Sequence, residues 1–147
     1  RKAEAQGLTP VQVAVIASIV ESETYIPKDM PTIASLYINR LRKGMPLQAD
    51  PTVKFALKDF ALKRIYHNML NTDSRYNTYK YAGLPPGPIK VASVAGIDAV
   101  LNAPTHSYLY MCAKEDFSGT HNFARTYAEH LQNARRYTQA LNQRNVR

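Results

Sequence analysis

The stretch TPVQVAVIASIVESET, residues 9–24, decides how the rest of the chain can fold. Its opening, Thr9-Pro-Val-Gln12, combines an N-cap threonine, a proline suited to the first helical position and a glutamine that completes a capping box. From Val11 to Val20 the residues are apolar on almost every side of a helix, which is typical of a helix buried among other elements. Pro27 stops such a helix soon afterwards. We therefore predict a buried helix that ends near Thr24.

Capping residues, helical spacing and turn formers predict the remaining elements. Prolines and glycines are too dense between residues 71 and 91 for a helix, so this segment is expected to be a rigid, extended loop. The order of elements predicts the α+β class: one helix-rich domain with a small antiparallel β-hairpin and a Pro/Gly-rich cleft loop. In chain order we expect helices from Asp29 to Gly44, from an Asp50 cap to Leu57, over residues 59–70 and from a Ser93 cap to Asn102, then strands at 108–113 and 121–123, and a helix from Thr126 to Gln143.

The whole chain, residues 1–147, has the size of a single domain. Hydrophobic residues make up 45% of it and charged residues 20%, a composition typical of a globular protein and not of a disordered one. No apolar run approaches the ~20 residues that a membrane-spanning helix needs. Residues 1–8 look like a linker or the end of an upstream helix, so we interpret the chain as a fragment of a longer protein.

The net charge of +8 implies an affinity for anions, such as nucleic acid, a membrane surface or an acidic polymer. The basic residues are scattered, however, and form no dense run of the kind found in nucleic-acid-binding tails. Solvated basic faces explain the charge more simply. Nucleic-acid binding is therefore the weakest interpretation, and no motif supports it.

Two carboxylates, Glu21 and Glu23, end the apolar helix. With about 100° between successive helical residues, Glu23 lies close to the line through Ile16 and Val20, whereas Glu21 lies well around the helix. Desolvation and the helix C-terminus both disfavour the charged form, so we expect raised pKa values for both glutamates. A carboxylic acid that stays protonated near neutral pH can protonate the leaving oxygen of a glycosidic bond. The alternative is that both glutamates simply pair with lysine or arginine.

A second group of candidate residues lies mainly in the tyrosine-rich loop. Their side chains are of the types that stack on sugar faces or bond to sugar hydroxyls, and loops rich in proline and glycine commonly shape a cleft. Ordinary packing of tyrosines beneath a loop is the alternative. The candidates are Gln48, Thr52, Tyr76, Asn77, Tyr79 and Tyr81.

The four histidines do not have the spacing of a metal site, since no pair at i, i+4 includes an adjacent glutamate. The chain also has only one cysteine and lacks the glycine-rich signatures of phosphate or dinucleotide binding. We therefore expect no metal and no cofactor.

Several segments, taken together and in order, resemble the catalytic domain of the endolytic murein transglycosylases, the MltG or YceG-like family. The similarity extends over nearly the whole chain, except for residues 55–71, which match no motif. The segments are ASIVESET at 17–24, ASLYINRL at 34–41, MPLQADPTV at 45–53, YNTY at 76–79, GLPPGPI at 83–89, YLY at 108–110 and HNF at 121–123.

The resemblance implies cleavage of the β-1,4 bond between N-acetylmuramic acid (MurNAc) and N-acetylglucosamine (GlcNAc) in peptidoglycan, without hydrolysis and with a 1,6-anhydro-MurNAc end as product. It also implies an inner-membrane anchor in a segment outside this chain, a domain on the extracytoplasmic side, and work on nascent glycan strands near peptidoglycan synthases. Glu23 matches the family's catalytic glutamate, so the resemblance assigns it the roles of acid and then base. The residues that would line or support the cleft are Gln48, Asp50, Tyr76, Asn77 and Thr78, and Glu21 would tune or orient the site.

Two other functions fit the same residues. A lysozyme-type hydrolase would use water and leave a reducing end instead of the anhydro end. A non-catalytic glycan-binding module would keep its function when Glu23 is replaced by glutamine.

Overall fold

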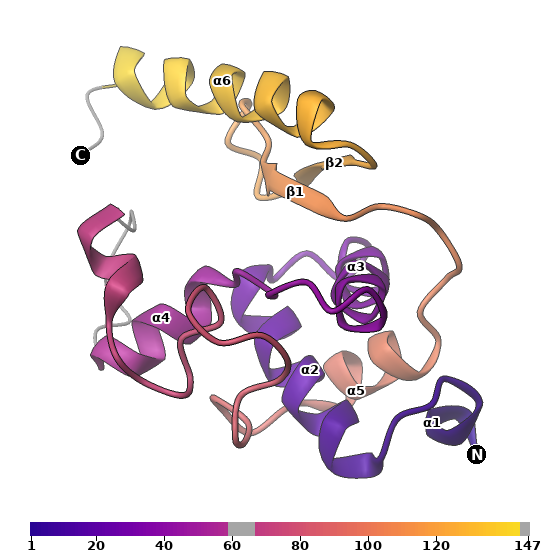
Figure 1. Cartoon of the computed structure of the whole chain (residues 1–147). Helices are drawn as coiled ribbons and strands as arrows, with labels where there is room; N and C mark the ends of the chain where they lie inside the picture. The colour runs from indigo at the N-terminus through magenta and orange to yellow at the C-terminus, as the bar shows by residue number, and fades with distance from the viewer. Residues whose placement is uncertain (59–66, 145–147) are drawn as a thin grey trace.

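The structure, a computed structural model, describes residues 1–58 and 67–144. Helix α2 (Pro10–Glu23) runs through the interior of a helical layer and packs against α3 (Met30–Arg42) and α5 (Val94–Leu101) (Figure 1). The predicted capping box is present, because the Thr9 hydroxyl accepts a hydrogen bond from the backbone N–H of Gln12 and the Gln12 side chain accepts one from that of Thr9. Ile16, Ile19 and Val20 are fully buried. The apolar stretch is therefore the central buried helix that its sequence predicts.

The remaining helical elements of this layer are short. They are α1 (Lys2–Ala5), α4 (Asp50–Leu57) and the 3₁₀ helix η1 (His67–Asn71). The helix predicted over residues 59–70 lies partly outside the described residues. The prediction that Asp50 is the N-cap of α4 is wrong. Ala49 occupies that position with extended backbone, and Asp50 is the first helical residue, so its carboxylate is free for another partner.

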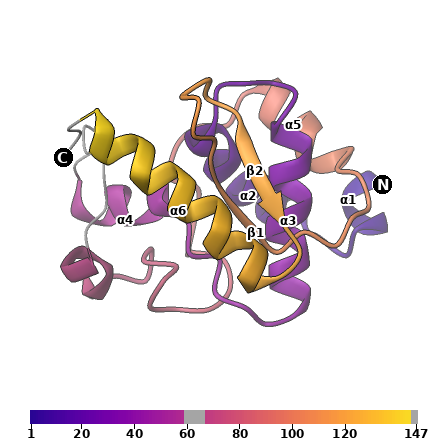
Figure 2. The same cartoon turned by 90° about the horizontal axis from the view of Figure 1, so that it is seen from above.

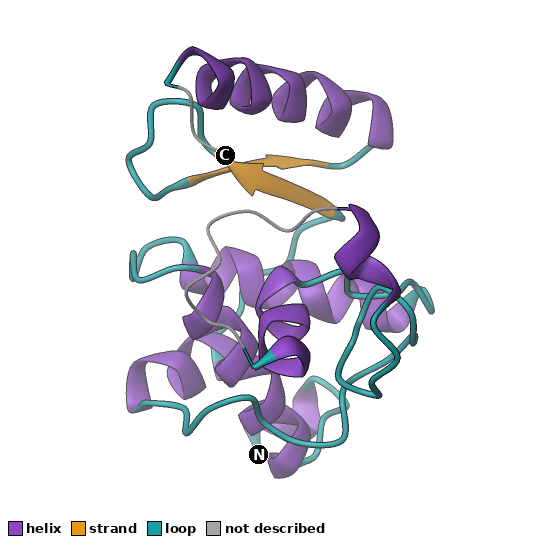
Figure 3. Cartoon of the chain, turned by 90° about the vertical axis from the view of Figure 1, so that its left-hand side faces the viewer, coloured by secondary structure: helices purple, strands orange, loops and turns teal. Residues whose placement is uncertain are grey.

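A second layer covers the helices. Strands β1 (Tyr110–Ala113) and β2 (His121–Ala124) form an antiparallel hairpin, with Met111 opposite Phe123. Helix α6 (Tyr127–Gln143) crosses the outer face of this hairpin (Figure 2). Seen from the side, α6, the hairpin and the helical layer are stacked in that order (Figure 3).

The first strand begins two residues later than predicted. The carbonyl oxygens of Tyr108 and Leu109 accept hydrogen bonds from the side chains of Asn39 and Arg40 on α3. These carbonyls therefore attach the segment before β1 to the helical layer. The predicted α+β class, the hairpin and the C-terminal helix are all confirmed.

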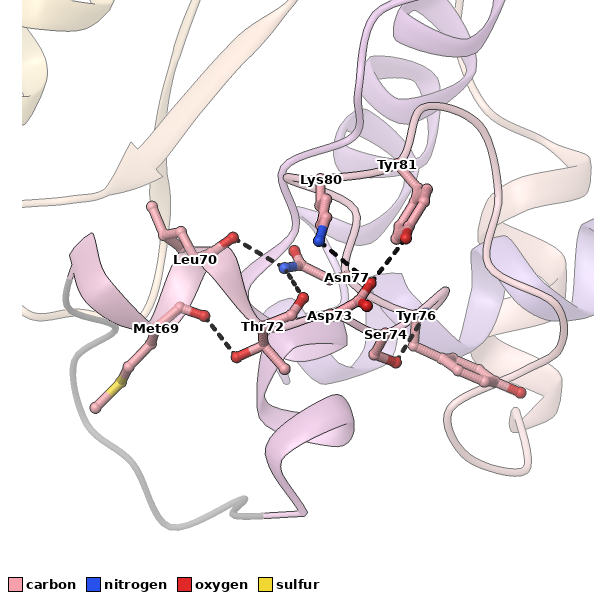
Figure 4. Close-up of polar contacts among 9 residues, drawn as sticks. All are labelled: Met69, Leu70, Thr72, Asp73, Ser74, Tyr76, Asn77, Lys80 and Tyr81. Carbon is pink, nitrogen blue, oxygen red and sulfur yellow. Dashed lines mark hydrogen bonds and ion pairs between the residues drawn. The ribbon is translucent and has the colours of Figure 1, made fainter.

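Side chains hold the loop between η1 and α5 in shape (Figure 4). The Asn77 amide donates to the carbonyl oxygens of Leu70 and Thr72, and the Asp73 carboxylate accepts hydrogen bonds from Lys80 and Tyr81. The loop is thus a fixed part of the fold, although it has no regular secondary structure. Within residues 1–58 and 67–144, no helix is both long and apolar enough to cross a membrane.

Candidate active site

A cavity of about 550 Å³ separates the helical layer from the hairpin and α6. The ends of α2 and α4, the middle of α3 and the loop at Gln48 line one side. Side chains of β1, β2 and α6 line the other. The lining is mixed, with tyrosines, histidines and four charged side chains. Such a lining suits a polar ligand that also offers apolar faces, as sugars do.

Glu23 is the last residue of α2 and lines this cavity. The Tyr37 hydroxyl donates a hydrogen bond to its Oε1 over 3.1 Å. As a whole residue, Glu23 is half-buried. Burial, followed by the negative charge of Asp50, raises the pKa of Glu23 to about 7. The Tyr37 bond and the Lys54 charge act in the opposite direction without cancelling that rise. Glu23 can therefore hold a proton near neutral pH and release it to a bound ligand.

Asp50 provides a second carboxylate in the cavity. Its Oδ1 accepts a hydrogen bond from the Tyr79 hydroxyl over 2.5 Å. Burial and the negative charge of Asp50 raise the pKa of Tyr79, so the phenol remains a donor to this carboxylate. The two carboxylates thus have different environments, each with its own tyrosine. Of the two, Glu23 is the carboxyl whose surroundings favour the neutral acid.

Gln48 also lines the cavity, in an unusual backbone conformation. Its φ of 51° lies in the left-handed region, which residues other than glycine rarely adopt. The adjoining backbone is anchored to Thr78, whose carbonyl accepts from the N–H of Gln48 and whose hydroxyl accepts from the N–H of Ala49. The Thr52 hydroxyl lies 2.8 Å from that of Thr78. Both threonines are buried, so they position Gln48 from beneath the cavity lining.

The structure separates Glu21 from the cavity. The Glu21 carboxylate accepts hydrogen bonds from the backbone N–H and hydroxyl of Ser93, and Lys90 lies 3.5 Å away. Burial acts to raise the pKa of Glu21, but the Ser93 hydrogen bonds and the Lys90 charge outweigh it, and the pKa is lowered. The expectation of a raised pKa at Glu21 is therefore wrong. The contacts favour a structural role in fixing the start of α5.

Four of the predicted site residues, Glu23, Gln48, Asp50 and Tyr79, line the cavity. Tyr76 and Asn77 do not: the ring of Tyr76 packs on Phe55, and the amide of Asn77 holds the loop together. Sequence reasoning also missed residues that the cavity exposes. Spacing within each helix or strand does not indicate which layer will cover it. The missed residues are Tyr37, Arg40, Lys54, Tyr110, His121 and His130.

The described part of the chain contains no group of three or more His, Cys, Asp or Glu side chains arranged to hold a metal ion. The chemistry that this arrangement does offer is proton transfer by Glu23. A buried acid with a pKa near the working pH, in a cavity lined by hydroxyl-bearing side chains, is suited to general acid–base catalysis. The class of protein that such a site fits is a general acid–base catalyst.

Comparisons with known proteins agree with this class. A profile of the YceG-like family matches residues 1–136. The endolytic murein transglycosylase of Bacillus subtilis (strain 168) is 40% identical over 132 residues, which cover 88% of this chain and 35% of that protein. The endolytic murein transglycosylase of Streptococcus pneumoniae serotype 2 (strain D39) is 33% identical over 114 residues, or 75% of this chain and 21% of that protein.

A solved structure of a yceG-like protein has a similar fold. The 2.6 Å crystal structure of a yceG-like protein from Listeria monocytogenes superposes with a TM-score of 0.81 at 37% identity, over 89% of this chain and 42% of that one. The chain belongs to the YceG-like family. It spans about a third of the length of the Bacillus relative and about a fifth of that of the Streptococcus relative.

Proposed function

We propose that this chain is the catalytic domain of a lytic transglycosylase that cleaves peptidoglycan glycan strands between MurNAc and GlcNAc. The observation that carries the proposal is the position of Glu23, whose pKa is raised to about 7 in a cavity of about 550 Å³. Relatives named endolytic murein transglycosylase, together with the family match, support the substrate class. Cleavage within nascent strands is part of the proposal.

In the proposed reaction, protonated Glu23 donates its proton to the glycosidic oxygen. The bond between C1 of MurNAc and that oxygen breaks, and its electron pair stays with the departing GlcNAc. An oxocarbenium-like centre develops at C1. The C6 hydroxyl of the same MurNAc then attacks C1, and the Glu23 carboxylate takes the hydroxyl proton. The enzyme returns to its starting state, water is not consumed, and the product carries a 1,6-anhydro ring.

The other members of the site have supporting roles in this proposal. Asp50 raises the proton affinity of Glu23 through its charge, and Tyr37 orients the Glu23 carboxyl. Gln48 faces the substrate from a backbone fixed by Thr78 and Thr52. We place Glu21, Tyr76 and Asn77 outside direct contact with the sugar, as supports of the surrounding fold.

Asp50 also motivates a second candidate, hydrolysis. Glycosidases that use water require a second carboxylate as general base or nucleophile. Asp50 lies in the cavity that contains Glu23 and could take that role. The two candidates differ in their products, since a transglycosylase forms anhydro ends and a hydrolase forms reducing ends that incorporate an oxygen from water.

The decisive experiment digests purified peptidoglycan in ¹⁸O-labelled water with the wild-type chain and with Glu23→Gln. The products are then analysed by mass spectrometry. Unlabelled anhydro-muropeptides from the wild type, absent with Glu23→Gln, support the proposal. Labelled reducing ends would replace it with hydrolysis. Strand binding without any product would indicate the glycan-binding module. Glu4→Gln, an exposed glutamate on α1, is the matched control and should retain full activity.

The cellular setting follows from the substrate. Peptidoglycan lies outside the cytoplasm, so we place the domain on the extracytoplasmic side of the inner membrane. We further propose that a segment outside this chain anchors it there, close to peptidoglycan synthases. Fractionation and cross-linking of the full-length protein in cells test both points, and a cytoplasmic location would refute them.

A further inference from the structure

Arg40 is a buried cation in the cavity. It lies on α3 with 6% of its surface exposed and lines the cavity together with Glu23. Its Nε donates to the carbonyl oxygen of Leu109 over 2.6 Å, and its Nη1 donates to that of Pro46 over 2.7 Å. The guanidinium also lies over the Tyr110 ring, with 5.1 Å between the guanidinium carbon and the ring centroid.

No described carboxylate neutralises this charge. Within residues 1–58 and 67–144, none of the ion pairs includes Arg40. A guanidinium has five N–H donors, and the hydrogen bonds of Arg40 to described residues use two of them. A buried charge without an ionic partner is unfavourable. Hydrogen bonds to the carbonyl oxygens of Leu109 and Pro46 need N–H donors, but they do not need a positive charge. These two contacts therefore do not by themselves explain why a charged arginine occupies this position.

His130 also lines the cavity, from the opposite layer. The Nδ1 atom of His130, on α6, is buried and has no hydrogen-bond partner among the described residues. Both side chains lie against the Tyr110 ring: the Arg40 guanidinium carbon is 5.1 Å from its centroid and the His130 ring centroid is 5.3 Å from it. Burial and the positive charge of Arg40 both lower the pKa of His130. A neutral imidazole can carry its proton on Nδ1 and donate it. Arg40 therefore presents the unused donors in the cavity, and the unpaired ring of His130 lies beside it on the opposite layer.

We propose that Arg40 binds a carboxylate on the lactyl-peptide branch of a MurNAc residue. This inference rests on the proposed peptidoglycan substrate. GlcNAc is uncharged, whereas MurNAc carries a lactyl group whose carboxyl is free in stripped strands or joined to a stem peptide that bears carboxylates of its own. Arginine matches the planar geometry of a carboxylate with two parallel N–H groups.

The location suits such a role. Tyr37 and Arg40 are three residues apart on α3, so their side chains lie on the same face of the helix. Tyr37 holds Glu23, and Arg40 lies one turn further along. A carboxylate bound at Arg40 would fix the branched sugar relative to the acid. The site would then distinguish MurNAc from GlcNAc, and so select which of the two alternating glycosidic bonds is cut.

Binding to the inactive Glu23→Gln chain tests the inference by calorimetry. The first probe is a stemless GlcNAc–MurNAc oligosaccharide with free lactyl carboxylates, compared with its methyl ester. The second is the same glycan with stem peptides, compared with its fully amidated form. We expect neutralisation in at least one pair to weaken binding about tenfold or more, as for the loss of a charge-assisted hydrogen bond. The pair that responds identifies the carboxylate as lactyl or peptide.

Two variants assign the effect to Arg40. Arg40→Gln should remove the difference between the acid and neutral probes. Arg42→Gln, an exposed arginine of α3 bonded to the Gln6 carbonyl, removes the same charge outside the cavity and should keep that difference. Equal binding of acid and neutral probes in both series overturns the inference, even if Arg40→Gln fails to fold. A folded Arg40→Gln chain that still prefers the acid also overturns it.

The outcome is distinguishable from failure of the proposed function. Equal binding of all probes, with anhydro products still formed by the wild type, refutes the role of Arg40 alone. A clear preference for the carboxylate, with no products formed, refutes catalysis alone.

Discussion

The hydroxyl of Tyr37 donates a hydrogen bond to Oε1 of Glu23 over 3.1 Å, joining the middle of α3 to the end of α2. This bond favours the ionised glutamate, whereas burial and Asp50 favour the neutral one. The balance sets the pKa of Glu23 near 7, where the residue can both give and accept a proton. The proposed mechanism requires both steps of one side chain.

Replacing Tyr37 with phenylalanine should move the alkaline limb of the pH–rate profile to higher pH. In the wild type the Tyr37 hydrogen bond lowers the pKa of Glu23. Its removal therefore raises that pKa and leaves the acid protonated further into the alkaline range. At about pH 8 the fraction of enzyme in the active form should rise a few-fold, although poorer orientation lowers the maximal rate. The measurement is kcat/KM against pH with a soluble glycan. A limb that moves to lower pH contradicts this role.

Asp50→Asn should move the same limb in the opposite direction. Without the negative charge of Asp50, Glu23 loses its proton more easily, and activity at about pH 8 should fall a few-fold or more. Asp73→Asn, which removes an exposed carboxylate from the loop beyond the cavity, is the control and should leave the profile unchanged. If the alkaline limb of Asp50→Asn coincides with that of the wild type, the charge of Asp50 does not affect the pKa of Glu23.

Glu23→Gln should stabilise the fold at alkaline pH. The folded pKa of about 7 exceeds the ordinary value of 4.5, so the unfolded chain ionises first as pH rises. The folded state therefore loses stability between about pH 4.5 and pH 7, and the loss is complete above about pH 7. Neutral glutamine avoids this loss. We expect a gain on the order of 1–3 kcal/mol in the free energy of unfolding at about pH 8 and little change at about pH 4. Urea unfolding at both pH values measures it, and an equal effect at both would refute the ionisation account.

Glu21→Gln should separate stability from chemistry. The lowered pKa of Glu21 means that its ionised form stabilises the fold above about pH 4.5 and that this stabilisation is lost as pH falls through the folded pKa. Replacement should therefore reduce stability by about 1–2 kcal/mol at neutral pH. The products formed per folded molecule should not change. Loss of anhydro products at full folding would return Glu21 to the active site.

Gln48→Gly tests whether backbone strain serves substrate binding. Glycine adopts a φ of 51° without steric cost, so the fold should be equally stable or more stable, by up to about 1 kcal/mol. KM should rise because the side chain that faces the cavity is lost. Thermal unfolding and steady-state kinetics measure the two effects. A variant that loses stability, with KM unchanged, would show that Gln48 serves packing alone.

Much of the fold could be predicted from local signals. The Thr9 capping box and Pro10 fix the start of α2, and Ser93 and Thr126 cap α5 and α6 as their sequences indicate. The prediction that Asp50 caps α4 was wrong. The Asp50 carboxylate instead accepts a hydrogen bond from Tyr79, 29 residues away, and no local pattern reveals such a partner.

The candidate site could be predicted only in part. Periodicity indicates that Glu23 and Glu21 lie on different sides of α2, but their pKa values depend on partners from distant segments, Tyr37 for one and Ser93 for the other. The residues of the hairpin and α6 reach the cavity only because that layer folds over the helices. Sequence spacing within each element cannot indicate this.

The central claim is that Glu23 carries a proton near neutral pH before any sugar binds. A ¹³C NMR titration of the glutamate side-chain carboxyls, assigned with Glu23→Gln, measures this directly. A midpoint for Glu23 near 7 is the predicted result, with Tyr37→Phe higher and Asp50→Asn lower. A midpoint near the ordinary value of 4.5 would contradict the account, because the side chain would then have no proton to donate at neutral pH.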